Sequence, residues 1–211
     1  MGEAATRLLT VDEFLDWDDG TDRRYQLLNG VVTMMAPPQA LHGSLVNELG
    51  AVLRAGLKRP CRVITEAGIK PPHRNDAYYQ ADLAVTCRPL ERGEVYLPEP
   101  RIVVEVISPS TAATDRVHKL DDYRRTASIT DILLVATSRI EIEHWHRQGA
   151  VWVVANAGPG ENIILRDYAI TIDIDALYAD LPVAGDGAEP PPGTNAFNSL
   201  SSRMPWQNSS P

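Results

Sequence analysis

The chain has few cysteines and no long hydrophobic run, and acidic residues outnumber basic ones. Cys61 and Cys87 are the only cysteines among its 211 residues, and we expect both to be reduced, small core residues of strands. No apolar run approaches the ~20 residues that a membrane span needs, and no charged-then-apolar signal peptide opens the sequence. These absences predict a soluble, cytoplasmic protein with no membrane partner.

The shortage of basic charge also limits the ways in which this chain can bind nucleic acid. The formal net charge is −8 and the pI is about 5.1. A general electrostatic grip on nucleic acid needs clustered Lys and Arg, so the sequence leaves room only for a local basic groove. In the densest basic stretch, residues 116–125, nearby aspartates favour a solvated helix face. The functional alternative is a phosphate-contacting edge at Arg116 and Lys119.

Hydrophobic spacing and turn residues predict a mixture of helices and strands. Helices are expected at 10–18, 40–57, 114–127 and 174–181. Strands are expected at 24–28, 31–35, 61–66, 68–70, 82–87, 101–107, 131–137, 140–147, 150–155, 162–165 and 169–174. With no internal repeat, this order predicts an α/β (α+β) fold in which helices flank a mixed central β-sheet and extra β-hairpins are attached.

The length and the change in composition near the end predict one domain followed by a tail. Residues 1–182 are long enough to form a single domain with a sizeable core. Residues 183–211 are rich in Pro, Gly and Ser, and we expect this segment to be disordered or loosely attached.

Two acidic residues in strands are the strongest indication of chemistry. Glu105 lies alone in the apolar run 101–107, where a buried carboxylate is costly unless a cation or a hydrogen-bond donor meets it. Asp82 is expected to open a second strand. If the two strands are neighbours, both carboxylates can reach one point near a sheet edge or fork. There a divalent cation would relieve their repulsion, with the Val106 carbonyl as a third ligand and Lys119 beside an attacking water.

Spacing alone favours a structural interpretation, because Asp82, Glu105 and Lys119 match no tight local motif. A buried Glu105 paired with a cation from an adjacent helix is a common internal ion pair. Asp82 is then a polar strand start, and Lys119 is a solvated helix residue. In the same way, His144 and His146 share one face of a strand, but no third ligand lies near them in sequence, so we expect no metal there.

A set of short phrases adds weight to the chemical interpretation: Tyr25-Gln-Leu-Leu-Asn-Gly30, Met35-Ala-Pro-Pro38 with His42, Asp82-Leu-Ala-Val85, Val103-Val-Glu-Val-Ile-Ser-Pro-Ser-Thr111, and Asp115 with Lys119-Leu-Asp-Asp-Tyr123. Together they resemble the Uma family of restriction-endonuclease-like proteins, a bacterial branch of the PD-(D/E)XK nucleases. The resemblance covers roughly residues 8 to 181.

This resemblance implies a metal-dependent endonuclease that acts on DNA with Mg²⁺ or Mn²⁺. Asp82 matches the first acid of the motif and Glu105 the second. The usual lysine position two residues further on holds Ile107, and the resemblance places that lysine on the following helix at Lys119. His42 matches a family position that can face the site, against the alternative of a polar residue near a helix terminus.

The chain departs from the family at Gln26, where a glutamate is usual, and at Ala81, where the motif prefers proline. Glutamine offers a neutral oxygen without charge, which supports an alternative function as a non-catalytic nucleic-acid-binding or interaction protein. An enzyme acting on nucleotides or RNA is a third hypothesis. Because cutting both DNA strands often needs two active sites, a homodimer that pairs through residues 140–155 is also expected.

Overall fold

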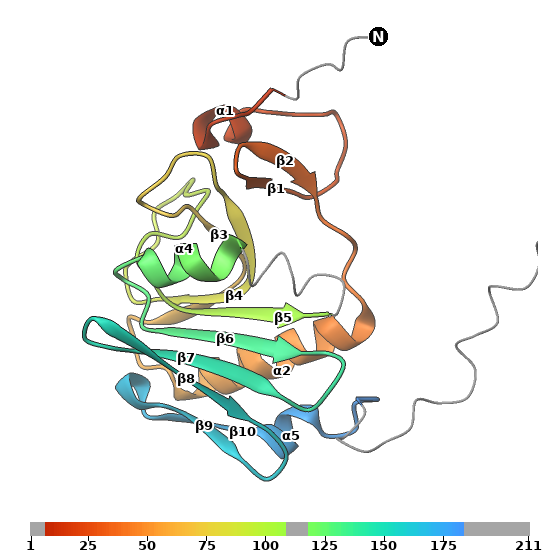
Figure 1. Cartoon of the computed structure of the whole chain (residues 1–211), viewed down its shortest axis with the longest axis vertical. Helices are drawn as coiled ribbons and strands as arrows, with labels where there is room; N and C mark the ends of the chain where they lie inside the picture. The colour runs from red at the N-terminus through yellow and green to blue at the C-terminus, as the bar shows by residue number, and fades with distance from the viewer. Residues whose placement is uncertain (1–6, 109–117, 184–211) are drawn as a thin grey trace, which may run out of the picture.

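The centre of the molecule is a six-stranded mixed β-sheet (Figure 1). The computed structural model describes residues 7–108 and 118–183. In spatial order the strands are β3 (Arg62–Ile69), β4 (Tyr79–Thr86), β5 (Pro100–Ile107), β6 (Asp131–Ala136), β7 (Ile142–Gln148) and β8 (Val151–Ala157). Strands β5 and β6 are parallel, and the other neighbouring pairs are antiparallel. The predicted mixed central sheet is therefore confirmed.

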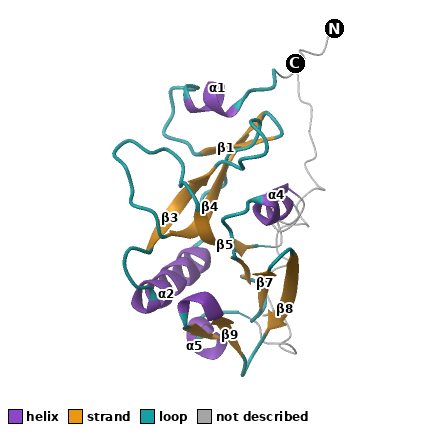
Figure 2. Cartoon of the chain, turned by 90° about the vertical axis from the view of Figure 1, so that its left-hand side faces the viewer, coloured by secondary structure: helices purple, strands orange, loops and turns teal. Residues whose placement is uncertain are grey.

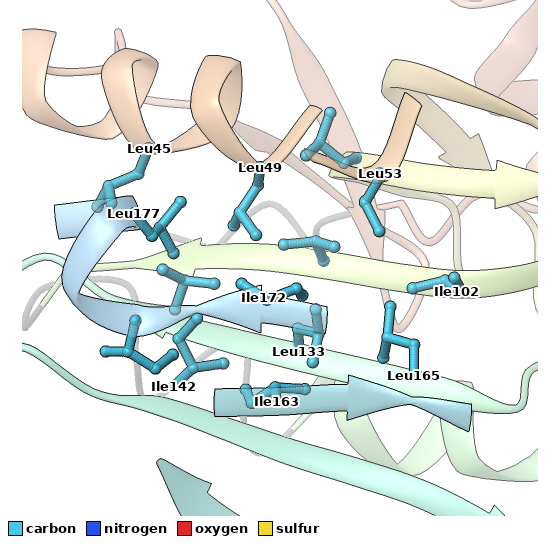
Figure 3. Close-up of a cluster of buried hydrophobic side chains, with 14 of the residues drawn as sticks. Leu45, Leu49, Leu53, Ile102, Leu133, Ile142, Ile163, Leu165, Ile172 and Leu177 are labelled. Atoms are coloured by element: carbon cyan, nitrogen blue, oxygen red, sulfur yellow. The ribbon is translucent and has the colours of Figure 1, made fainter. Parts of the chain in front are cut away.

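One face of the sheet is covered by the long helix α2 (Ala40–Gly56), as the spacing of its leucines predicts. Leu45, Leu49 and Leu53 follow one another at four-residue intervals, and all three are fully buried. They belong to one core with Ile102 and Leu133 of the sheet (Figure 3). The same core includes the hairpin of β9 (Asn162–Leu165) and β10 (Ile170–Asp173), which are joined through η2 (Arg166–Tyr168), and the short helix α5 (Ile174–Tyr178).

The opposite face of the sheet is covered by helix α4 (Leu120–Arg125), so that α2 and α4 lie on opposite sides of the strands (Figure 2). Tyr123 of α4 is fully buried among residues of the second core, including Val103 and Leu134. Burial on both faces explains why β5 and β6 are apolar almost throughout. The predicted helix 114–127 is seen only from its later part, because residues 109–117 lie outside the described residues.

A small N-terminal unit packs beside β4. Strands β1 (Tyr25–Leu28) and β2 (Val31–Met34) form the predicted hairpin, and its Asn29-Gly30 turn has φ of 51° and 78° at these two residues. Positive φ at both turn positions is the reason that Asn-Gly is favoured there. Helix α1 (Val11–Leu15) begins with the predicted capping box, in which the Thr10 side chain accepts from the Glu13 amide. Leu27 bridges to Tyr78.

Two predicted strand boundaries are wrong. The strands expected at 61–66 and 68–70 are one strand, β3, because Glu66 adopts a φ of 51° and is left unpaired between the Thr65–Leu83 and Ala67–Ala81 pairs. The register is the same on both sides of Glu66, because one residue of each strand lies between these two pairs, and the ladder resumes beyond it. Strand β4 begins at Tyr79, so that Asp82 lies inside the strand and does not open it.

The expectation that both cysteines are reduced is also wrong. Cys61 and Cys87 form a disulfide that spans 26 residues of sequence. The β3–β4 ladder ends at the pair Arg62–Thr86, and the cysteines lie one residue beyond it, Cys61 just before β3 and Cys87 just after β4. The sequence alone did not give this register.

No helix among the described residues is long and apolar enough to cross a membrane. The proposed tail from residue 184 onward lies outside the described residues, so its predicted disorder stays a prediction.

Candidate active site

The site is built at a fork between two central strands. Strands β4 and β5 are paired from Thr86 and Pro100 as far as Leu83 and Val104. Beyond that pair β4 continues alongside β3, whereas β5 continues alongside β6 up to the pair Ile107–Ala136. Asp82 and Glu105 are the first residues past the last shared pair. The fork that spacing allowed is thus present, and it frees both side chains from the regular ladder.

Asp82 holds the two diverging strands together at this point. Its Oδ2 accepts a hydrogen bond from the Val106 amide at 2.7 Å, which replaces a backbone partner that the fork removes. Its Oδ1 lies 3.1 Å from Nε2 of His42, near the start of helix α2. His42 therefore contacts Asp82, and its proposed role at the site stays a prediction. Val106 is joined to Asp82 through its amide, while the proposed role of its carbonyl stays a prediction.

Glu105 is 3% exposed, and its charge is met by donors from the segment around α4. Nζ of Lys119 lies 3.3 and 3.2 Å from its two carboxylate oxygens. The Tyr123 hydroxyl donates to Glu105 Oε1 at 2.6 Å. Lys119 is itself 3% exposed, so it is not a solvated helix residue. A cation and a hydroxyl donor together make a buried carboxylate tolerable.

A second buried network, centred on Tyr79 and Asp122, contacts Tyr123. The rings of Tyr79 and Tyr123 meet edge to face with centroids 5.8 Å apart, and the Tyr79 hydroxyl donates to Asp122. Asp122 is also bonded to His73 Nε2 at 2.9 Å and to Arg74 Nη1 at 3.1 Å. Burial, reinforced by the hydrogen bond to the Asp122 carboxylate, raises the pKa of Tyr79, so this phenol stays protonated. Tyr79 is 1% exposed, so it packs in the core and is not available to stack on a base.

Gln26, which stands where the family usually has an acid, lies on β1 and is 8% exposed. Its Oε1 is buried, and within residues 7–108 and 118–183 it has no hydrogen-bond partner. A buried acceptor without a donor is costly, which is consistent with a position that a cation or another donor can complete. Arg116, the predicted phosphate contact, lies outside the described residues.

The donor set at the fork suits a hard divalent cation. Carboxylate and carbonyl oxygens are the ligands that Mg²⁺ and Mn²⁺ prefer, and Asp82 and Glu105 supply the former from adjacent strands. The residues present therefore fit such an ion.

Sequence reasoning brought together Asp82, Glu105 and Lys119 but missed the contact of Tyr123 with Glu105. A signal for it was available, because Lys119 and Tyr123 are four residues apart. On a helix this spacing places both side chains on one face. The supporting residues His73 and Asp122 gave no such local signal, since their contact joins positions 49 residues apart.

Comparison with known proteins agrees with this architecture. Residues 11–175 match the family model Uma2, described as "Putative restriction endonuclease". Two proteins of Synechocystis are similar: uncharacterized protein slr1290, 26% identical over 82% of this chain and 93% of its own length, and uncharacterized protein sll1609, 21% identical over 69% and 85%. A crystal structure from Anabaena variabilis, described as a putative nuclease belonging to DUF820, superposes with a TM-score of 0.63. It is 20% identical, over 81% of this chain and 97% of the other, which establishes a shared fold.

Proposed function

The chain belongs to the Uma2 family of restriction-endonuclease-like proteins, and from this membership we propose that it is a metal-dependent endonuclease hydrolysing DNA phosphodiester bonds. The observation that carries the proposal is the fork between β4 and β5, where Asp82 and Glu105 follow the last shared pair and Lys119 contacts Glu105. A buried glutamate with a dedicated lysine is costly to maintain, which favours a catalytic purpose.

In this proposal the divalent cation is Mg²⁺ or Mn²⁺, held by Asp82, Glu105 and the Val106 carbonyl. The bound ion would acidify a water and stabilise the negative charge that develops on the phosphate. The amide of Val106 fixes the Asp82 carboxylate, and the Tyr123 hydroxyl fixes that of Glu105. Both acids are then held in place before substrate binds, which lowers the reorganisation needed for reaction.

Lys119 is proposed to orient or activate the attacking water. Its ammonium group is already confined beside Glu105, so a water near that carboxylate would lie within its reach. A cation there favours the deprotonated form of the water and neutralises charge in the transition state.

His42, 3.1 Å from Asp82, is a candidate donor to a phosphate oxygen, and Arg116 is a proposed phosphate contact from the adjoining segment.

Nicking of supercoiled plasmid by the purified chain tests the proposal. We expect cleavage with Mg²⁺ or Mn²⁺ and none in excess chelator. Asp82→Asn and Glu105→Gln keep side-chain size and remove charge, and each should abolish cleavage. Glu91→Gln is a matched control, because Glu91 is exposed and pairs with Arg88 in the loop between β4 and β5. Full activity in both site variants would overturn the assignment of these acids.

A second function is favoured by one specific observation, the neutral Gln26, whose buried Oε1 has no hydrogen-bond partner in the described part of the chain. If that position is needed to complete a metal site, the chain is a nucleic-acid-binding or interaction protein on a nuclease fold. It would then shift DNA in a gel without cutting it. Gln26→Glu separates the two functions, because a gain of metal-dependent cleavage would show that the glutamine had inactivated an otherwise complete site. RNA and nucleotide substrates belong in the same assay.

We also propose that the chain forms a homodimer through the outer edge of β8. In the described part of the chain β8 ends the sheet, and no strand pairs with its outer edge. Val151, Val153 and Val154 are 61%, 43% and 47% exposed on it. An apolar edge strand with unpaired backbone groups is a template for pairing with another chain. A two-fold pair would provide two active sites for the two strands of DNA.

A further inference from the structure

Two histidines and an aspartate converge at the end of the sheet on strands β6 and β7. His144 Nε2 lies 2.8 Å from Oδ1 of Asp131, and His146 Nδ1 lies 2.9 Å from the same oxygen. The register explains this arrangement, because Asp131 is directly opposite His146 and two residues from the partner of His144. Their potential ligand atoms all lie within 4.8 Å of one another. The missing third ligand of the sequence analysis is therefore supplied by the neighbouring strand.

The surroundings of this cluster resemble those of a metal ligand set. Asp131 is fully buried, and Thr130 Oγ1 donates to its other oxygen, Oδ2, at 2.9 Å. The hydroxyls of Thr130 and Tyr168 are 3.3 Å apart, which extends the network to η2. Carboxylates that bind metals are usually oriented by outer hydrogen bonds of this kind. The side chains of His144 and His146 are 12% and 17% exposed, so a small ion can reach them.

We propose that Asp131, His144 and His146 bind a first-row transition-metal ion of the Zn²⁺ type. Zinc takes imidazole nitrogen and carboxylate oxygen at ~2.0–2.2 Å, so tetrahedral ligands lie about 3.3 Å apart. The observed nitrogen-to-oxygen distances of 2.8 and 2.9 Å need only a small expansion to admit the ion. Three protein ligands leave a fourth position for water.

Nitrogen donors distinguish this site from the fork. Imidazole ligands suit zinc and its neighbours, whereas Mg²⁺ prefers the all-oxygen set of Asp82 and Glu105. The two sites also lie on opposite faces of the sheet. Ile102, paired with Asp131, belongs to the core under α2, whereas Val103 and Ile107, which flank Glu105 at two-residue intervals, belong to the core under α4. The proposed ion would tie β6 to β7 and is not part of the nuclease centre.

Zinc binding to the full chain is the test. It is measured by isothermal titration with Zn²⁺ alone and by elemental analysis after dialysis. We expect one zinc per chain in the wild type and also in Glu105→Gln, which disables the fork. His144→Gln and His146→Gln should each weaken zinc binding at least about tenfold. His73→Gln is the matched control, because His73 is also half-buried and bonded to a carboxylate. It should bind zinc as the wild type does.

Thermal unfolding gives a second measurement that is independent of cleavage. An ion that binds only the folded state raises its melting temperature, so zinc should stabilise the wild type and His73→Gln but neither His144→Gln nor His146→Gln. Circular dichroism without metal establishes that each variant is folded. The proposal is overturned if folded wild type takes up no zinc. It is equally overturned if the two histidine variants bind zinc as tightly as the control.

Discussion

The buried pair of Glu105 and Lys119 sets the first prediction at the scale of single residues. Removing the lysine takes away a cation that contacts a buried carboxylate, so Lys119→Met should lower the free energy of unfolding by about 3–5 kcal/mol. Adding Glu105→Gln removes the uncompensated charge while keeping an acceptor for Tyr123, and most of the loss should be recovered. Urea denaturation measures both variants. A loss below about 1 kcal/mol in the single variant would show that the pair is not coupled as its geometry indicates.

Asp131 gives a prediction on pH. Burial acts to raise the pKa of Asp131, but hydrogen bonds from His144, His146 and Thr130 outweigh it and hold that pKa below its ordinary value. The unfolded chain takes up this proton first as the pH falls. The stabilisation by Asp131 is therefore complete above about pH 4 and is lost as the pH falls below that towards the folded-state pKa.

Metal-free urea denaturation at a series of pH values checks this expectation against Asp131→Asn. The wild type should lose more unfolding free energy than the variant as the pH falls below about 4, because asparagine does not titrate. Parallel losses in the two proteins would contradict the lowered pKa.

The sequence predicted some of the site residues individually, but it did not predict which of them contact one another. Asp82, Glu105 and Lys119 could be singled out because a charge in an apolar run is conspicuous without any knowledge of pairing. Asp131 could not be connected with His144, because their contact depends on the register between β6 and β7. A carboxylate at the start of a strand has no local feature that separates a ligand from an ordinary polar end.

At the scale of elements, the disulfide between the ends of β3 and β4 makes a measurable prediction. Closing a loop of 26 residues restricts the unfolded chain, which stabilises the fold by about 3 kcal/mol. Reduction should therefore lower the urea midpoint of the wild type. The double variant Cys61→Ser/Cys87→Ser is the control, because reductant should not change its midpoint. Two free thiols in the unfolded, unreduced protein would show that the bond does not form in solution.

The sequence predicted best those elements whose characteristic residue patterns lie within a short stretch of chain. The leucine spacing of α2 and the Asn29-Gly30 turn are contained within a few residues, and both elements are present. Strand β3 was divided in two, although the ladder with β4 only skips Glu66 and continues in the same register beyond it. The start of β4 was misplaced because the polar residues before Asp82 resemble a loop, whereas Tyr79 is held in the sheet by its partner Ile69.

At the scale of the whole molecule, the order of the strands was the part that sequence could not give. Each local pattern fitted a mixed sheet, but the fork depends on β4 leaving β5 while β5 stays with β6. Both faces of the resulting sheet are packed, with α2 over one and α4 over the other (Figure 2). The candidate site is consequently a property of topology, although its residues were visible in the sequence.

The exposed edge of β8 gives the prediction at this scale. If two copies pair along it, the backbone groups at the edge find partners and the valines of both chains become buried. The wild type should then sediment at about twice its monomer mass of 23.2 kDa. Val153→Lys places a positive charge on this edge in both copies and replaces an apolar contact, so it should give monomers.

Ile164→Lys is the matched control for this edge, because Ile164 is 55% exposed on β9 and lies outside the proposed interface. It should leave the sedimenting mass unchanged, as measured by analytical ultracentrifugation.

The same variants connect assembly to activity. If two sites act on the two DNA strands, a monomeric Val153→Lys protein should still nick plasmid but should produce fewer linear molecules, because each encounter then brings one active site. Monomeric wild type at the concentrations that cleave DNA would exclude this edge as the route to double-strand cutting.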